Sequence, residues 1–168
     1  MIWTDISDEL LDMLEPYSEW FFKQDLTPLN KLAWDNPKNT STMDTGCSNE
    51  YLDEVVEADG RHEGFPEISY SYDLKAGNLP GEFHDRYQNL STELCTWLGA
   101  RNEAVHVYYP KNGFMSWHNN WNAPGYNILL SYTKNGGGFF KYRDPKTHEV
   151  NEMLDTPGWS CKVGYYGR

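Results

Sequence analysis

The sequence predicts a single-domain α+β fold in which helices and loops precede a compact antiparallel β unit. The chain has 168 residues, a length that fits one domain able to bury roughly 70% of its unfolded surface. Apolar residues recur at helical spacing up to Ala100. After Ala100 the pattern changes to short β-like runs separated by turn signals, which is typical of a sandwich or barrel.

Two helices with an apolar face are predicted in the first hundred residues, besides a short acidic helix. Residues 6–22 place several leucines on one face of a short amphipathic helix, which Pro16 should end or kink. Residues 81–98 repeat apolar side chains at intervals of four and three, which predicts an α-helix that Gly99 ends. The expected core face of this helix consists of Phe83, Tyr87, Leu90, Leu94 and Trp97.

The segments around these helices are assigned from turn residues and alternation. Residues 25–62 are polar and indicate loops around a short acidic helix at 49–57. So long an irregular stretch is either disordered or a lid over a site. Residues 68–74 alternate and are rich in β-formers, so we expect a strand. Five β-like runs follow, at 104–110, 115–121, 126–133, 137–143 and 159–167.

Composition excludes several classes of function. The formal charge of −11 would repel a phosphate backbone, so we expect no nucleic acid as a partner. No segment approaches the ~18 apolar residues of a membrane span, and the acidic N-terminus does not resemble a secretory signal. The cysteines Cys47, Cys95 and Cys161 have no close spacing, which fits a reducing cytoplasm. Cys95 is expected to be a small buried hydrophobe.

The stretch YPKNGFMSWHNN, residues 109–120, contains the candidate metal ligands. Alternate residues of a strand project from the same face, so His118 and Asn120 would point the same way. A histidine and a carboxylate so arranged are two of the three ligands of the facial triad that binds iron in oxygenases. Asn120 offers an amide oxygen without charge, which should bind a cation more weakly. The alternative is that His118 is a hydrogen-bonded structural residue.

The motifs around this stretch resemble those of the 2-oxoglutarate and Fe(II)-dependent oxygenases, particularly the prolyl-hydroxylase-like branch. That branch has a Tyr-Pro-x-Asn-Gly turn, a strand with His-x-Asp, a Pro-Gly loop, a long apolar strand and a Gly-Gly turn into an aromatic strand. The chain also resembles small oxygenase-like proteins carried by phages, which would place it in the cytoplasm of an infected cell. The matching segments are 109–113, 118–120, 124–125, 126–134 and 136–140.

This resemblance implies a double-stranded β-helix of the jelly-roll or cupin type, with residues 1–100 as helical and loop support and 101–168 as the β core. It implies Fe(II) and 2-oxoglutarate as cofactors and hydroxylation of a small-molecule or protein substrate. His118 would be one iron ligand and Asn120 the second or a group beside it. Tyr109 would contact the cosubstrate, and Ser131 would either face it or be a small side chain making room.

Two departures from the family pattern favour a different function. The family's aspartate is Asn120 here, and its second histidine and its arginine would follow Arg168, so we expect the last strands of the core to be missing. His148 follows a hairpin turn and should face solvent. The alternative hypothesis is therefore a non-catalytic binding or structural module that keeps the fold with a degenerate metal site. The substrate and the oligomeric state stay open.

Overall fold

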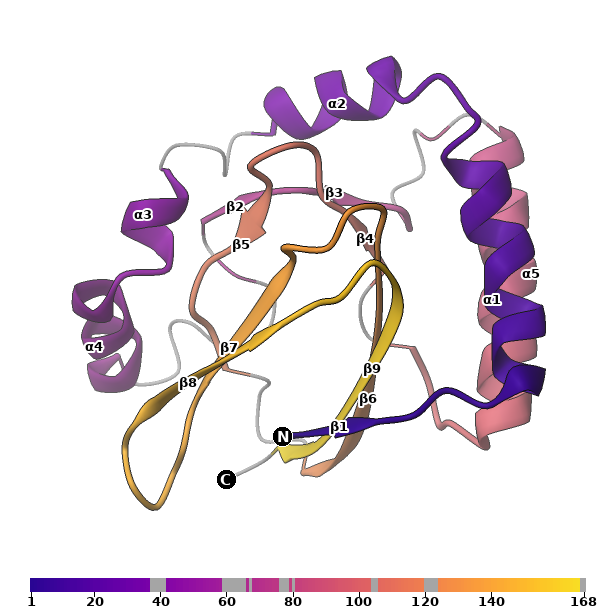
Figure 1. Ribbon diagram of the computed structural model, residues 1–168. Helices are drawn as coiled ribbons and strands as arrows, with labels where there is room; N and C mark the ends of the chain where they lie inside the picture. The colour runs from indigo at the N-terminus through magenta and orange to yellow at the C-terminus, as the bar shows by residue number, and fades with distance from the viewer. Residues whose placement is uncertain are drawn as a thin grey trace. The chain divides into compact units, whose positions relative to one another are not determined.

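The α+β class is confirmed by the computed structural model, in which helices alternate with several small antiparallel sheets (Figure 1). The chain divides into two compact units. We call Met1–Ser18 with Ala123–Arg168 the sheet unit, and Glu19–Asn122 the helical unit. The residues that the structure describes are 1–36, 42–58, 66, 68–75, 79, 81–103, 106–119 and 124–166.

A three-stranded antiparallel sheet organises the sheet unit. Its strand order is β1 (Ile2–Thr4), β9 (Gly158–Tyr166) and β6 (Gly125–Thr133). β6 and β9 pair in one continuous register over their whole length. Two further strands, β7 (Phe139–Arg143) and β8 (Val150–Leu154), form a separate hairpin.

The β7–β8 hairpin turns at Asp144, as its turn residues predict. The Asp144 carboxylate accepts hydrogen bonds from the backbone N–H groups of Lys146 and Thr147, at 2.7 and 3.0 Å. His148 closes the turn with a φ of 62°, a left-handed conformation that histidine tolerates better than most residues do. His148 is exposed, which confirms the prediction that it faces solvent.

Helix α1 (Asp8–Phe21) covers one face of the three-stranded sheet. Leu10 and Leu14 are buried in the part of α1 that belongs to the sheet unit. The indole N–H of Trp159 donates to the Ser18 hydroxyl at 3.1 Å, so Trp159 and its same-face neighbour Cys161 lie towards the helix. The opposite face carries Lys162.

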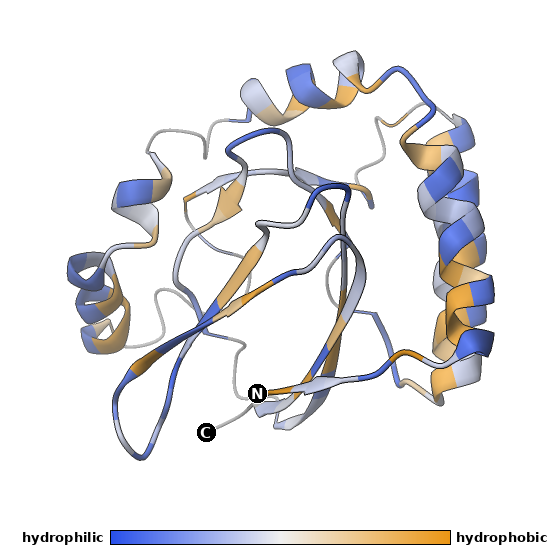
Figure 2. Ribbon diagram, viewed as in Figure 1, coloured by the Kyte–Doolittle hydropathy of each residue, from blue (hydrophilic) through white to orange (hydrophobic). Residues whose placement is uncertain are grey.

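The helical unit holds the remaining helices and two short β-pairs. The helices are α2 (Thr27–Trp34), α3 (Met43–Gly46), α4 (Asn49–Glu57) and α5 (Gly81–Leu98). β2 (Ser69–Tyr70) pairs with β5 (Phe114–Met115), and β3 (Tyr72–Asp73) pairs with β4 (Val107–Tyr108). In its core the Phe21 ring lies 5.5 Å from Phe83 and 5.6 Å from Tyr108, centroid to centroid. Figure 2 shows the mixture of apolar and polar residues that makes α1 and α5 amphipathic.

The predicted helices are confirmed with two corrections. α4 matches residues 49–57, and the Ser48 hydroxyl caps it by accepting from the Tyr51 N–H at 3.1 Å. α1 continues through Pro16, so this proline does not end the helix. α2 was missed because its start signal, a proline in the first turn, stands among polar loop residues. The start of α5 packs on Trp20 and Phe21 through Phe83.

The expected core face of α5 is correct for its first three positions. Phe83, Tyr87 and Leu90 are buried, and Gly99 ends the helix with a φ of 61°. Leu94 is only half-buried and Trp97 is 48% exposed, so the prediction that Trp97 belongs to the core is wrong. The aromatic rings of Trp20 and Phe21 on α1 contact Phe83 in the first turn of α5. Cys95 is half-buried.

The predicted strands at 126–133 and 159–167 are confirmed as β6 and β9, whereas other strands are shorter or more divided than the sequence predicts. The expected strand at 68–74 is two strands, because β2 and β3 pair with different partners. In the described part of the run at 115–121, only Met115 lies in a strand, as the last residue of β5. Residues 136–138 join β6 to β7, which lie in different sheets. β1 and β8 were not predicted.

The described strands form four separate antiparallel sheets and do not close into a barrel. The double-stranded β-helix is therefore not confirmed, whereas the mixed α+β class is. The single domain at 1–168 stays a prediction. Among the described helices, none has both the length and the apolar character needed to cross a membrane.

Candidate functional site

The turn before the candidate ligands is built as the sequence suggests. The Gly113 N–H donates to the Pro110 carbonyl at 2.8 Å, and Asn112 has a φ of 65°. A Cβ at Gly113 would lie 2.7 Å from the Tyr70 carbonyl oxygen, so only glycine fits beside β2. The turn thus fixes where β5 begins and directs the chain towards His118.

His118 lies three residues beyond the end of β5, outside a regular strand. Its Nδ1 is 2.8 Å from the Ser116 carbonyl oxygen. A carbonyl only accepts, so Nδ1 carries the proton and donates it, which leaves the lone pair on Nε2. Burial lowers the pKa of His118 below its ordinary value, and the bond to Ser116 partly opposes this shift. The imidazole is therefore neutral at pH 7 and has the tautomer that binds metals through Nε2.

The residues preceding His118 contain buried polar atoms that the described part of the chain leaves unsatisfied. These atoms are the Ser116 hydroxyl and the Trp117 indole nitrogen. The Trp117 backbone N–H donates to the Gly46 carbonyl at 3.2 Å, which fixes the segment against α3. A Cβ at Gly46 would lie 2.6 Å from the Phe114 ring, so this close approach requires glycine. We call Ser116–His118 the histidine segment.

Tyr109, the second predicted site residue of the helical unit, is 45% exposed. Desolvation raises the pKa of its hydroxyl, and the electrostatic effect of the nearby Cys47 raises it further. Both observations fit a ring that is open to solvent on one side while protein atoms surround its hydroxyl. Tyr109 is therefore a protonated hydrogen-bond donor at pH 7 and is not an ordinary core tyrosine.

Asn120 lies outside the described residues, so its predicted role stays a prediction. Among the residues that are described, no group of at least three His, Cys, Asp or Glu side chains is arranged to hold a metal ion.

His148 forms a surface contact within the β7–β8 hairpin: its Nδ1 accepts a hydrogen bond from the Arg143 guanidinium at 2.7 Å. Trp159 packs on Tyr132 with ring centroids 5.5 Å apart.

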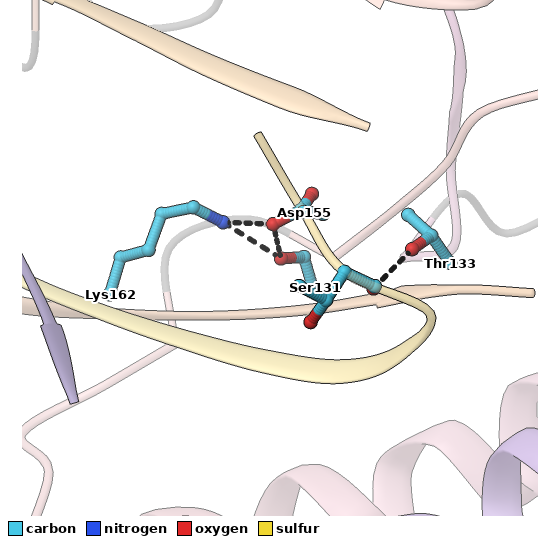
Figure 3. A network of polar contacts seen from close by, with 5 residues as sticks. Ser131, Thr133, Asp155 and Lys162 are labelled. Carbon is cyan, nitrogen blue, oxygen red and sulfur yellow. Dashed lines mark hydrogen bonds and ion pairs between the residues drawn. The ribbon is translucent and has the colours of Figure 1, made fainter. Parts of the chain in front are cut away.

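Ser131, the fourth predicted site residue, lies in the sheet unit within a cluster that the sequence did not predict (Figure 3). Its hydroxyl donates to the Asp155 carboxylate and accepts from the Lys162 ammonium, each at 3.1 Å. Lys162 also forms an ion pair with Asp155, and the two side chains are only 1% and 6% exposed. We call these three residues the lysine cluster.

The polar side-chain groups of the lysine cluster bond to one another. The Lys162 ammonium lies 4.6 Å from the centre of the Trp3 ring, which adds a cation–π contact to its two polar partners. Asp155 is held at the base of the β7–β8 hairpin, where its N–H donates to the Gly138 carbonyl at 2.7 Å. The cluster therefore ties the hairpin to the sheet. Beside it, the Ser160 hydroxyl is buried without a described partner.

A second unpredicted cluster lies in the helical unit on α5. The Glu103 carboxylate accepts from the Tyr87 hydroxyl at 2.5 Å and also from Ser91. The His106 ring stacks on Tyr87 with centroids 3.8 Å apart. Burial lowers the pKa of His106 to about 3, and the Lys75 charge contributes to this shift. His106 is therefore neutral at physiological pH.

In comparisons with known proteins, no family model, curated protein or solved structure matches the chain significantly.

Proposed function

We propose that the protein is a 2-oxoglutarate and Fe(II)-dependent oxygenase-like protein with a metal site centred on His118. The observation that carries this proposal is the tautomer of His118. Histidines that bind metals usually donate their other ring N–H to a carbonyl or carboxylate, and His118 donates to the Ser116 carbonyl. Its Nε2 is therefore oriented and unprotonated, as a ligand must be. The proposal includes a double-stranded β-helix as the complete fold.

His118 and Asn120 together would suit a weakly held divalent cation. His118 would supply one neutral ligand and Asn120 a second, uncharged oxygen. A carboxylate at position 120 would add the charge that iron sites of this type normally use, so we expect the amide to lower the affinity. An iron bound there would supply the dioxygen activation that hydroxylation requires. The Tyr109 hydroxyl would donate a hydrogen bond to an anionic cosubstrate, because its raised pKa keeps it protonated.

The second candidate function is a non-catalytic binding or structural module. The lysine cluster favours it, because the Ser131 hydroxyl is already engaged by Asp155 and Lys162. The resemblance implies that this side chain either faces the cosubstrate or makes room for it, and its two hydrogen bonds support a structural role. Under this candidate the protein binds a partner without turning over 2-oxoglutarate.

Metal-dependent thermal melts test the proposal. Mn(II), as a redox-stable substitute for Fe(II), should raise the melting temperature of the parent slightly and that of Asn120→Asp more, because a ligand of the folded state stabilises it. His118→Ala should abolish the shift in both backgrounds. His148→Ala is the matched control, since it removes an exposed histidine, and the shift should persist.

The outcomes separate the two candidates. We expect iron to be lost on dialysis and conversion of 2-oxoglutarate to succinate to be low in the parent. If Asn120→Asp is equally destabilised with and without Mn(II), the pair is structural and the oxygenase-like proposal is wrong. A shift that survives His118→Ala would place the metal elsewhere.

A further inference from the structure

Strand β6 lies at the edge of its sheet and buries none of its residues. The strand order β1–β9–β6 gives it one described neighbour, and every residue from Gly125 to Thr133 is half-buried or exposed. Its partner β9 buries Ser160, Cys161 and Lys162 in succession. A run of apolar residues such as 128–130 is usually covered in a folded protein, so the exposure of β6 calls for a partner.

β6 also lacks the features that keep edge strands from pairing. Monomeric proteins protect such edges with charged residues, prolines or bulges. The sequence of β6, GYNILLSYT, has no charged residue and no proline. Its register with β9 runs from Gly125 to Thr133 without a bulge. The strand is therefore an unbulged and neutral edge in a chain whose formal charge is −11.

The sequence of β6 is nearly symmetric about Leu129. Ile128 and Leu130 flank Leu129, and the polar residues Asn127 and Ser131 flank those two. In an antiparallel pair of identical strands centred on Leu129, Ile128 would face Leu130 of the other copy. Asn127 would face Ser131, and Leu129 would face itself. Each pair matches in polarity, which is the self-complementarity that a two-fold interface requires.

We infer that β6 pairs with β6 of a second copy of this chain, antiparallel and with Leu129 on the two-fold axis. The pairing joins two three-stranded sheets into one continuous sheet. Nine residues at about 3.4 Å each span roughly 30 Å, and such a strand pair buries on the order of 1,000 Å² in total. This area is at the low end for specific interfaces, so the dimer should dissociate in the micromolar range. Salt should strengthen it by screening the repulsion between two acidic chains.

Disulfide trapping tests the register directly. Residues opposite each other in an antiparallel pair have Cα atoms about 4.5 or 5.5 Å apart, and both separations suit a disulfide. Leu129→Cys should therefore form a 129–129 crosslink under mild oxidation. Asn127→Cys is the matched control, because its two copies would lie about 14 Å apart along the strands and cannot join. Peptide mass spectrometry distinguishes this crosslink from any disulfide of Cys47, Cys95 or Cys161.

Sedimentation velocity tests the dimer without a crosslink. The parent should dimerise between about 1 and 200 μM, and Ile128→Lys should stay monomeric because it places an ammonium against Leu130 of the other copy. Ile128 is 44% exposed and Leu154 on β8 is 61% exposed, so Leu154→Lys controls for adding a charge to an apolar strand position. Circular dichroism melts establish that both variants fold. A parent that is monomeric at 200 μM in high salt overturns the inference, as does an Ile128→Lys variant that dimerises like the parent, or equal crosslinking at positions 127 and 129.

Discussion

The lysine cluster of the sheet unit and the histidine segment of the helical unit use buried polar atoms in opposite ways. In the lysine cluster, Lys162, Asp155 and Ser131 satisfy one another. In the histidine segment, the Ser116 hydroxyl and the Trp117 indole nitrogen are buried without described partners, and His118 keeps an unprotonated nitrogen. A polar group that is fully paired stabilises the fold, whereas one with an open position is available to a ligand. The comparison therefore supports a structural role for the lysine cluster and makes the histidine segment the place where the proposed ligand would bind.

The largest expected effect comes from breaking the lysine cluster. Asp155→Asn would leave the buried Lys162 ammonium without a countercharge, so the free energy of unfolding should fall by about 3–5 kcal/mol in urea titrations. Glu152→Gln is the matched control, because Glu152 pairs with Lys141 at 3.7 Å in the same hairpin but at the surface. It should cost less than about 1 kcal/mol. Equal losses in the two variants would show that the burial of the cluster contributes nothing.

Two serine substitutions probe both groups with the same chemical change. Ser131→Ala removes the acceptor of one Lys162 hydrogen bond and a donor to Asp155, so it should cost about 1–3 kcal/mol. Ser116→Ala removes a buried hydroxyl that bonds to no described group, so the free energy of unfolding should change by less than about 0.5 kcal/mol. Urea midpoints measure both. A large loss for Ser116→Ala would mean that its hydroxyl is paired.

The two half-buried histidines of the helical unit predict a dependence of stability on pH. His106 has a folded-state pKa of about 3, well below the ordinary value of 6.5, so the unfolded chain binds a proton more readily. Its contribution to stability is complete above about pH 6.5 and is lost as the pH falls towards 3. Between pH 7 and pH 5 we expect a loss on the order of 1–2 kcal/mol.

His106→Phe should flatten this pH dependence while keeping a ring stacked on Tyr87. If the parent and His106→Phe lose stability equally between pH 7 and pH 5, burial of a neutral His106 is not the cause.

The pKa of His118 is lowered in the same direction as that of His106. Metal binding at His118 should therefore persist slightly below pH 6.5 and fail at lower pH.

The sequence predicts those parts of the fold that local patterns determine. α4 and α5 follow from their spacing, the Ser48 cap and Gly99, all within a few residues of each helix. β1 could not be predicted, because it exists only through pairing with β9 at the far end of the chain. The split of 68–74 into β2 and β3 depends in the same way on partners distant in sequence.

For the candidate site, too, the sequence points only to residues that a local pattern marks. His118 and Tyr109 stand out because the Asn112-Gly113 turn marks their segment. The sequence did not single out Lys162 as a buried residue, because a lysine within an alternating strand suggests a solvent-facing position. Its partner Ser131 lies 31 residues away in the chain, so the contact depends on the pairing of β6 with β9. Ser131 was therefore singled out for a different role from the one its hydrogen bonds support.

The protonation of the His118 ring tests the central claim most directly. Long-range ¹H–¹⁵N NMR of the imidazole distinguishes a protonated Nδ1 from a protonated Nε2, and His118→Gln identifies the signals. We predict a neutral ring at pH 7 with the proton on Nδ1, and a selective shift of Nε2 on addition of Zn(II), a diamagnetic substitute for Fe(II). A proton on Nε2, or an Nε2 signal that saturating Zn(II) does not change, would contradict the assignment of a metal site to His118.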